Sequence, residues 1–287
     1  MDHPIKRLAQ KDYPPMLREI PDMPAELYVR GKMPPKDCEY LCVVGSRATT
    51  PYGRRMCMSI ISGLAGYNVA IVSGMALGID SQAHTSALDV GLPTIAVLPS
   101  SLDDRSIYPS TNRALAARIL ARGCALVSEY GTAHKAMIHD FPKRNRIGAG
   151  MSRATLIIEA GEKSGTLITA RLALDYNREV LAVPHELGRE TGAGVNQLIR
   201  DGATLVRNAD DVLQALNLKP SDKPTQTTLP TDLSPSEMKT LHALVEPLVR
   251  DELIEHSGLS AQEANVALSS LLIRGLIVER LGKVERV

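Results

Sequence analysis

The chain has 287 residues, of which 44% are hydrophobic, 23% charged and 3% aromatic, as expected for a folded globular protein of about two domains. Lys and Arg number 33 and Asp and Glu 32, and this formal net charge of +1 excludes a strong overall attraction to nucleic acid or to an anionic membrane. No apolar run approaches the about 18 residues that a membrane span requires. Because the chain also lacks a leader of charged and then apolar residues, it is expected to be cytoplasmic.

Residues 1–37 are rich in proline and charge, which predicts an arm packed on the core, with one extended piece at 26–29. From 38 to 216, short apolar runs alternate with segments of helical length. The runs lack the alternation of half-exposed strands, a pattern typical of parallel strands buried on both faces. The repeated units predict an α/β protein with a doubly wound, mostly parallel sheet. The expected strands are 41–44, 69–72, 94–98, 125–127, 155–158, 180–183 and 204–206, and the expected helices are 54–64, 81–88, 113–120, 167–176 and 209–216.

Residues 217–233 hold prolines among Thr, Ser and Lys and few apolar residues, which predicts a linker. Beyond it, three short helices and a small hairpin are expected within 234–287, a pattern typical of a winged-helix domain. Residues 231–287 carry six Lys/Arg against nine Asp/Glu, and the third helix has no basic residue before Arg274. This charge favours a protein-contact or structural role over duplex binding by a recognition helix.

Ligands of doubly wound sheets bind outside the carboxyl ends of the strands, so the loops after the apolar runs are candidate sites. Two of these loops combine glycines and a hydroxyl with free backbone N–H groups at a helix start, which favours anion binding. They contribute Gly45, Ser46 and Arg47, and Ser73, Gly74 and Gly78. Neither loop has the spacing of a dinucleotide-binding motif, so no cofactor is expected.

Basic charge is concentrated in residues 134–153, where five Lys/Arg and one Asp give a net of +4. This equals the surplus of the whole segment 1–230, which has 27 basic and 23 acidic residues. An expected loop at 139–147 contains Phe141, Lys143, Arg144, Asn145 and Arg146. An aromatic ring among Arg and Lys suits single-strand binding, since bases stack on the ring and guanidinium groups bind phosphates. Alternatively, the only Phe of the chain anchors this loop in the core and the arginines form structural ion pairs.

A second anion contact is predicted at Lys163, Ser164, Gly165 and Thr166, which open the helix expected at 167–176. The order of these residues is not that of a nucleoside-triphosphate loop. Glu159, at the end of the preceding strand, is expected to hold Arg144 or Arg146 in place. In an alternative function, Glu159 is the catalytic residue of a hydrolase that cleaves nucleoside monophosphates.

The remaining ionisable residues predict neither a metal site nor a defined catalytic group. His84 lies four residues after Asp80 and is either a general base or part of a helix-capping network. His134 and His139 do not have the spacing of metal ligands. The four cysteines are Cys38, Cys42, Cys57 and Cys124. They are too few for a disulfide scaffold and are expected to be structural thiols.

Seven ordered motifs resemble the DNA-processing protein A family (DprA, also called Smf), from about Tyr13 to Leu216. They are Gly45-Ser46-Arg47, Ser73-Gly74-x-Ala76-x-Gly78-Ile79-Asp80-x3-His84, Tyr108-Pro109-x2-Asn112, Ser128-Glu129, Phe141-Pro142-x-Arg144-Asn145-Arg146, Glu159-Ala160-x2-Lys163-Ser164-Gly165-Thr166-x2-Thr169-Ala170 and Asn196-x-Leu198-Ile199-x2-Gly202-Ala203. The chain departs from the family pattern at Ser100-Ser101, at Gly148 and at His185.

The resemblance implies an extended Rossmann-like domain that binds single-stranded DNA in a basic pocket and forms a homodimer, followed by a winged-helix domain. It also implies a non-enzymatic role: the protein would protect DNA taken up in natural transformation and help load the recombinase RecA, displacing the single-strand-binding protein. The DNA-binding residues expected from the two lines of reasoning are Gly45, Ser46, Arg47, Ser73, Gly74, Gly78, Asn112, Phe141, Lys143, Arg144, Asn145, Arg146, Lys163, Ser164, Gly165 and Thr166.

Overall fold

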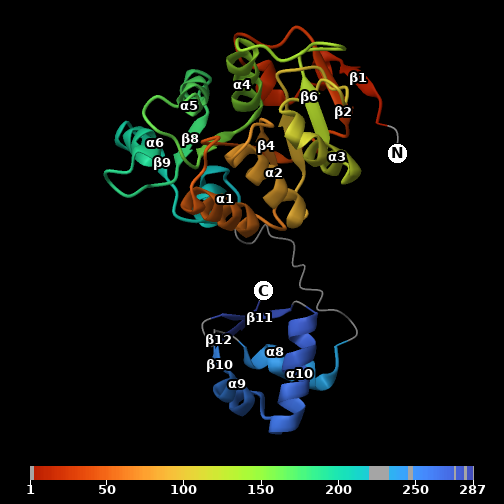
Figure 1. Cartoon of the computed structure of the whole chain (residues 1–287), viewed down its shortest axis with the longest axis vertical. Helices are drawn as coiled ribbons and strands as arrows, with labels where there is room; N and C mark the ends of the chain where they lie inside the picture. Colours follow the sequence, from red (N-terminus) through yellow and green to blue (C-terminus); the bar gives the residue numbers. More distant parts are fainter. Residues whose placement is uncertain (1–2, 220–232, 245–247, 275, 281–282, 287) are drawn as a thin grey trace. The chain divides into compact units, whose positions relative to one another are not determined.

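The computed structural model describes residues 3–219, 233–244, 248–274, 276–280 and 283–286. The chain divides into two compact units, Met1–Pro224 and Thr225–Val287 (Figure 1). Most of the linker predicted at 217–233 lies outside the described residues.

Within the described residues, nine strands of the first unit form one sheet in the order β1-β2-β6-β5-β4-β3-β7-β8-β9. From β6 to β9 along this order, neighbouring strands pair in parallel. The strands of this parallel part are β3 (Glu39–Val44), β4 (Val69–Ser73), β5 (Thr94–Val97), β6 (Ala125–Ser128), β7 (Ala154–Ile157), β8 (Glu179–Ala182) and β9 (Thr204–Leu205). The prediction of an α/β protein with a mostly parallel, Rossmann-like sheet is confirmed.

Two helical layers cover the sheet, because its strands are apolar on both faces (Figure 1). One face packs through Leu41 and Val43 of β3, and the other through Cys42 and Val44. The first face carries α1 (Pro51–Gly63), α2 (Ile79–Asp89) and α7 (Ala209–Ala215), and the second carries α4 (Asp140–Met151), α5 (Thr166–Asp175) and α6 (Glu190–Arg200). A further helix, α3 (Arg113–Ala121), packs against Leu126 of β6.

The N-terminal arm belongs to this core. Its strand β2 (Leu27–Gly31) pairs antiparallel with β6 and with β1 (Ile5–Leu8), and its short 3-10 helix η2 (Pro15–Arg18) buries Leu17. A second 3-10 turn, η1 (Gln10–Asp12), precedes η2. The Arg178 guanidinium donates a 2.8 Å hydrogen bond to the Met16 carbonyl and so ties the arm to the far side of the sheet.

The segment predicted as a loop at 139–147 is instead the first part of α4, so that prediction is wrong. Pro142, Gly148 and Gly150 give α4 a poor helix propensity. Pro142 is tolerated because it lies in the first turn, where a backbone N–H has no helical partner. Gly150 is required by packing, since a Cβ there would lie 2.8 Å from Cδ1 of Ile20 in the arm. Tertiary contacts therefore override local preference, and α6 and β1 were also not predicted.

The second unit contains α8 (Pro235–Ala243), α9 (Arg250–Ser257) and α10 (Ala261–Ile273) with a sheet in the order β10-β12-β11. Its strands are β10 (Leu248–Val249), β11 (Ile277–Arg280) and β12 (Lys283–Arg286). Capping boxes start α8 at Ser234 and α10 at Ser260. Leucines fill its core together with Ile277 and Val284. The winged-helix interpretation of this unit stays a prediction.

Replacing Leu27 by Ala tests whether the arm is part of the cooperative core. Leu27 is 0% exposed, so we expect Leu27→Ala to lower the free energy of unfolding by about 2–5 kcal/mol through lost burial and a residual cavity. Urea unfolding followed by circular dichroism measures the change. Leu187→Ala is the matched control: Leu187 is 88% exposed, and the expected change is within about 0.5 kcal/mol. Equal effects of the two substitutions would contradict the assignment of the arm to the core.

Candidate nucleic-acid interface

The direction in which successive strands are added to the sheet reverses at β3. Strands β4, β5 and β6 follow on one side of β3, and β7, β8 and β9 follow on its other side. The connections after β3 and β7 lead to helices on opposite faces, and this divergence opens a crevice at the carboxyl edge. A cavity of about 560 Å³ lies at this switch point. Its lining residues come from the ends of β3 and β4, from α4 and from the start of α5. They are Val44, Gly45, Ser46, Arg47, Ala48, Ala76, Asp80, Phe141, Pro142, Arg144, Asn145, Ser164, Gly165, Thr166, Ile168 and Thr169.

The helical geometry of α4 decides which of its basic residues reach this cavity. At about 100° per residue, Phe141, Arg144 and Asn145 share one face, and all three line the cavity. Lys143 points away and is exposed. Arg146 lies on another face, where its guanidinium pairs with Glu129 and donates to the Asp22 carbonyl. Arg146 thus forms an ion pair outside the cavity lining, and its expected role in DNA binding stays a prediction.

Arg144 places in the cavity wall a guanidinium group that donates no hydrogen bond within the described residues. The residue is only 8% exposed. Nη1 lies 3.8 Å from a carboxylate oxygen of Asp80, too far for a hydrogen bond but close enough for charge compensation. Burial raises the pKa of Asp80, and the Arg144 charge opposes this rise; burial also lowers the pKa of Arg144. The N–H groups of Arg144 remain available to an anionic ligand.

The loop after β4 gives this guanidinium its place. A Cβ on Gly74 would lie 1.9 Å from Nη1 of Arg144 and 2.2 Å from Oδ2 of Asp80, so any other residue there would displace this charge pair. Gly78 has a φ of 81°, and a Cβ on it would lie 2.2 Å from the Ser46 carbonyl oxygen. Ser73 Oγ donates a 2.6 Å hydrogen bond to the Val43 carbonyl. These three predicted residues lie behind the cavity wall and do not line it.

Asn112 also supports the site from behind. It lies in η3 (Ser110–Asn112) and is 8% exposed. Its Nδ2 donates to the Met75 carbonyl at 2.7 Å and to the Ala76 carbonyl at 3.4 Å. The residue therefore fixes the loop after β4 to the segment that precedes α3.

The rim of the cavity carries an Arg–Phe pair. Cζ of the exposed Arg47 lies 5.1 Å from the centroid of the half-buried Phe141 ring, over its face, which is cation–π geometry. Tyr108, which the predicted set omits, meets the same Phe ring edge-on at 5.7 Å. Its signal in the sequence is the Tyr-Pro motif, in a chain with very few aromatic residues.

The start of α5 forms the opposite wall. Ser164, Gly165 and Thr166 line the cavity. The N–H groups of Thr166, Leu167 and Ile168 already donate to Ser164 Oγ, the Ser164 carbonyl and the Gly165 carbonyl, so the helix start contributes its positive end rather than free donors. Lys163 is exposed and does not belong to the lining.

Glu159 does not hold either arginine, so that expectation is wrong. Its Oε2 accepts hydrogen bonds from Thr49 Oγ1 at 3.0 Å and from the Thr50 N–H at 2.9 Å, at the start of α1. The partners of the two arginines are Asp80 for one and Glu129 with Asp22 for the other. Glu159 is 0% exposed and lies outside the cavity lining, away from where the hydrolase alternative requires it.

His84 is part of a buried network. Its Nδ1 lies 2.7 Å from Thr94 Oγ1, which itself donates to the Ile71 carbonyl, so the imidazole is the donor in this pair. Burial lowers the pKa of His84 to about 4. A fully buried imidazole behind the loop after β4 has no access to a ligand and cannot serve as a general base there.

Asp140 anchors the first turn of α4 and was not recognised in the sequence. Its carboxylate accepts hydrogen bonds from the Tyr130 hydroxyl at 2.5 Å, from the Met137 N–H at 2.8 Å and from His134 Nε2 at 2.8 Å. The Tyr130 and His134 rings stack at 3.7 Å. Burial by itself would raise the pKa of Asp140, but these hydrogen bonds bring it below its ordinary value. The network fixes the segment that delivers Phe141.

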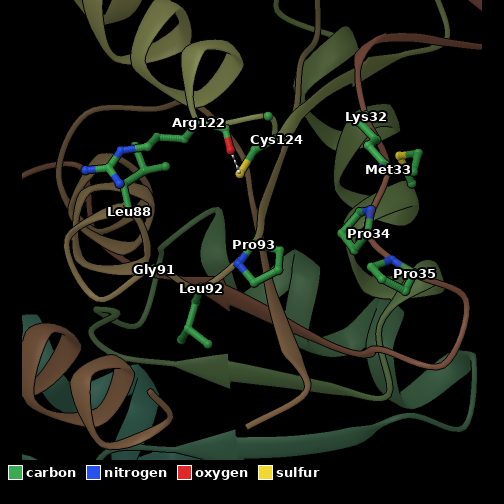
Figure 2. Close-up of a pocket in the computed structure, with 11 residues that line it drawn as sticks. Lys32, Met33, Pro34, Pro35, Leu88, Gly91, Leu92, Pro93, Arg122 and Cys124 are labelled. Carbon is green, nitrogen blue, oxygen red and sulfur yellow. Dashed lines mark hydrogen bonds between the residues drawn. The ribbon is translucent and has the colours of Figure 1, made fainter. Parts of the chain in front are cut away.

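A second cavity, of about 260 Å³, lies near the amino ends of β5 and β6 (Figure 2). Residues 32–35 of the arm line one side of it, and residues around Pro93 and Cys124 line the other. Its two cationic side chains, Lys32 and Arg122, have no helix start beside them, and ligands of this fold bind at the other edge of the sheet. The switch-point cavity is therefore the stronger candidate.

Comparison with known proteins decides the family. Residues 5–217 match the family described as DNA recombination-mediator protein A. The chain belongs to this family. It is 35% identical to protein Smf of Synechocystis over 94% of this chain and 77% of that protein. It is also 42% identical to protein Smf of Escherichia coli over 71% of this chain, which spans about half of that protein's length (54%).

Solved structures of the DprA family have the same fold as this chain. DprA of Streptococcus pneumoniae is similar with a TM-score of 0.67 and 36% identity, covering 73% of this chain and 74% of that one. DprA of Helicobacter pylori is similar with a TM-score of 0.65 and 29% identity, covering 75% of this chain and 96% of that one. The latter structure addresses the single-stranded DNA binding mode of the Helicobacter protein.

The described part of the chain contains no helix long and apolar enough to cross a membrane. Nor do its described residues group three His, Cys, Asp or Glu side chains in a way that could hold a metal ion. All four cysteines are free and buried, as predicted for structural thiols, and burial raises the pKa of Cys38, Cys42 and Cys57 to about 12.

Replacing Asp140 by Asn tests the anchor of α4. Because the folded-state pKa of Asp140 is depressed, its stabilisation is present above pH 4 or so and is lost as pH falls through the folded-state value. We expect Asp140→Asn to lower the free energy of unfolding by about 2 kcal/mol at pH 7, and the difference to shrink below about pH 4. Urea unfolding at several pH values measures this. Asp175→Asn, at an exposed position of α5, is the control, and a pH-independent effect of Asp140→Asn would contradict the account.

Proposed function

We propose that this protein is a non-enzymatic recombination mediator that binds single-stranded DNA in the switch-point cavity. It would protect DNA taken up in natural transformation and help load RecA onto it. Family membership supports this role, as does the single-strand binding of the Helicobacter relative. The observation that carries the proposal is the buried Arg144, whose guanidinium donates no hydrogen bond within the described residues, in the wall of a cavity large enough for a nucleotide.

The cavity offers different groups to the different parts of a nucleotide. Arg144 and the start of α5 suit a phosphate, because a guanidinium donates to anionic oxygens and the positive end of a helix attracts them. The Arg47–Phe141 pair suits a base, because bases stack on aromatic rings and on guanidinium planes. Few phosphates fit such a site, so binding should weaken with salt only moderately, with a slope of about 0.7 per contacted phosphate.

The wider functional setting rests on the family alone. The proposal includes RecA and the single-strand-binding protein as partners, a homodimer, and a cytoplasmic location. The second unit would contact protein rather than duplex DNA: on α10, the exposed Glu263, Asn265 and Val266 present no positive charge. A hydrolase of nucleoside monophosphates is not favoured, since Glu159 is engaged at α1. Incubation with nucleoside monophosphates should therefore release no free base.

Two substitutions in the cavity test the proposed binding. We expect Arg144→Gln and Phe141→Ala each to weaken binding of a fluorescent oligo-dT by about ten-fold, in line with about 1–3 kcal/mol for a stacked base or a charged hydrogen bond. Arg144→Gln should also reduce the salt slope by about 0.7, because one phosphate contact is lost, whereas Phe141→Ala should leave the slope unchanged. Fluorescence anisotropy in a salt series measures both quantities.

The control for charge is Arg200→Ala, at the exposed C-terminal end of α6, which lies at the opposite edge of the sheet. It should bind as the unsubstituted protein does, and circular dichroism should show that all three variants are folded. If both cavity variants bind oligo-dT with unchanged affinity, the assignment of the cavity is wrong. If the unsubstituted protein binds duplex DNA as well as single strands, the proposed ligand class is wrong.

A further inference from the structure

Tyr108 is an exposed aromatic residue that the surrounding structure holds in place. Its side chain is 49% exposed, while its neighbour Ile107 is 3% exposed and buried in the core around α3. Four residues later, Asn112 is tied to the loop after β4 through the Met75 carbonyl. The backbone on both sides of Tyr108 is therefore anchored, and its ring stands at the surface beside the cavity.

The Tyr108 ring has one aromatic neighbour and an unused hydroxyl. It meets Phe141 at a centroid distance of 5.7 Å with an interplanar angle of 73°. Within the described residues its hydroxyl makes no hydrogen bond, so the polar end of the residue serves no structural purpose there. Cζ of Arg47 lies over the same Phe141 ring, so both Tyr108 and Arg47 contact Phe141, and the three planar groups form a cluster around it.

We propose that Tyr108 is a second base-stacking residue and that it and the Arg47–Phe141 pair receive two adjacent bases of a strand that is bent between them. This inference rests on the proposed function and adds to it the reason for single-strand selectivity. Adjacent bases in a duplex are parallel and paired, whereas the two protein rings differ in orientation by 73°. Two bases stacked on these rings must unstack from each other.

A single strand can adopt this bend, because its backbone is flexible and its bases are unpaired. A duplex would have to break base pairs and lose stacking before it could meet both rings, which costs a few kcal/mol. Aromatic stacking is tolerant of sequence because every base has a π-face, so the same geometry accepts any base. The aromatic residues at the rim would then distinguish single strands from duplexes without recognising the base sequence.

The first test compares substitutions at Tyr108. We expect Tyr108→Ala and Tyr108→Leu each to weaken oligo-dT binding about ten-fold, with an unchanged salt slope, because a stacking contact is lost and no phosphate contact is. Tyr108→Phe keeps the ring and should bind within about two-fold of the unsubstituted protein. Leu keeps apolar volume against Phe141 but has no ring, so normal binding by Tyr108→Leu would overturn the inference even if the Ala variant were poorly folded.

The second test measures directly whether two adjacent bases of the bound strand unstack from each other. Two adjacent 2-aminopurines in an oligonucleotide give an exciton band in circular dichroism while they are stacked on each other. Placed at each position of a short oligonucleotide in turn, one such pair should lose this band on binding to the unsubstituted protein and keep it on binding to Tyr108→Leu. A band that persists at every position in the unsubstituted complex would show that no such bend forms.

The two proposals fail in different ways. If the unsubstituted protein does not bind oligo-dT, the proposed function fails. If Arg144→Gln and Phe141→Ala weaken binding while Tyr108→Leu does not, the cavity assignment stands and the role of Tyr108 fails.

Discussion

The parallel pairing of seven strands, buried on both faces, is the constraint on which the rest of the first unit depends. Parallel strands end at a common edge, and each following helix starts there with its positive end. Because β3 pairs with β4 on one side and β7 on the other, the chain must leave a crevice at that edge. The position of the candidate site follows from topology before any of its side chains is considered.

The side chains then determine what the crevice can hold. Arg144 is largely buried, and Asp80 compensates its charge without accepting a hydrogen bond from it. Its Nε is a buried donor without an acceptor, which is costly, and its terminal N–H groups lie in the cavity wall, where an incoming phosphate would accept hydrogen bonds from them. The bare backbone of Gly74 gives the guanidinium its space. The site thus combines unused guanidinium donors with a second cation, Arg47, at the rim, which suits an anionic ligand.

A feature of the fold or of the candidate site is predictable from the sequence when a pattern of neighbouring residues indicates it. The strands carry their own signal in short apolar runs, so the sheet is predictable from the sequence, and the glycine loops at the ends of these runs indicate the edge where the candidate site lies. The separation of Arg144 from Arg146 is not predictable in this way, because it depends on α4 being a helix, and the packing of Gly150 on Ile20 across the chain allows that helix. The partners of Asp140 are only three to ten residues away, but they lie in an irregular segment whose conformation no periodic pattern predicts. The contact of Tyr108 with Phe141 joins positions 33 residues apart, and the Tyr-Pro motif marks Tyr108 without indicating that contact.

The most direct test of the central claim is to locate the DNA on the protein. An oligo-dT that carries 5-iodouracil can be photo-crosslinked to the full chain, and the modified residues can be identified by mass spectrometry. The account predicts crosslinks to Phe141 or Tyr108, the two aromatic residues at the rim of the switch-point cavity. Crosslinks confined to residues 32–35 and 122–124, at the other edge of the sheet, would contradict it.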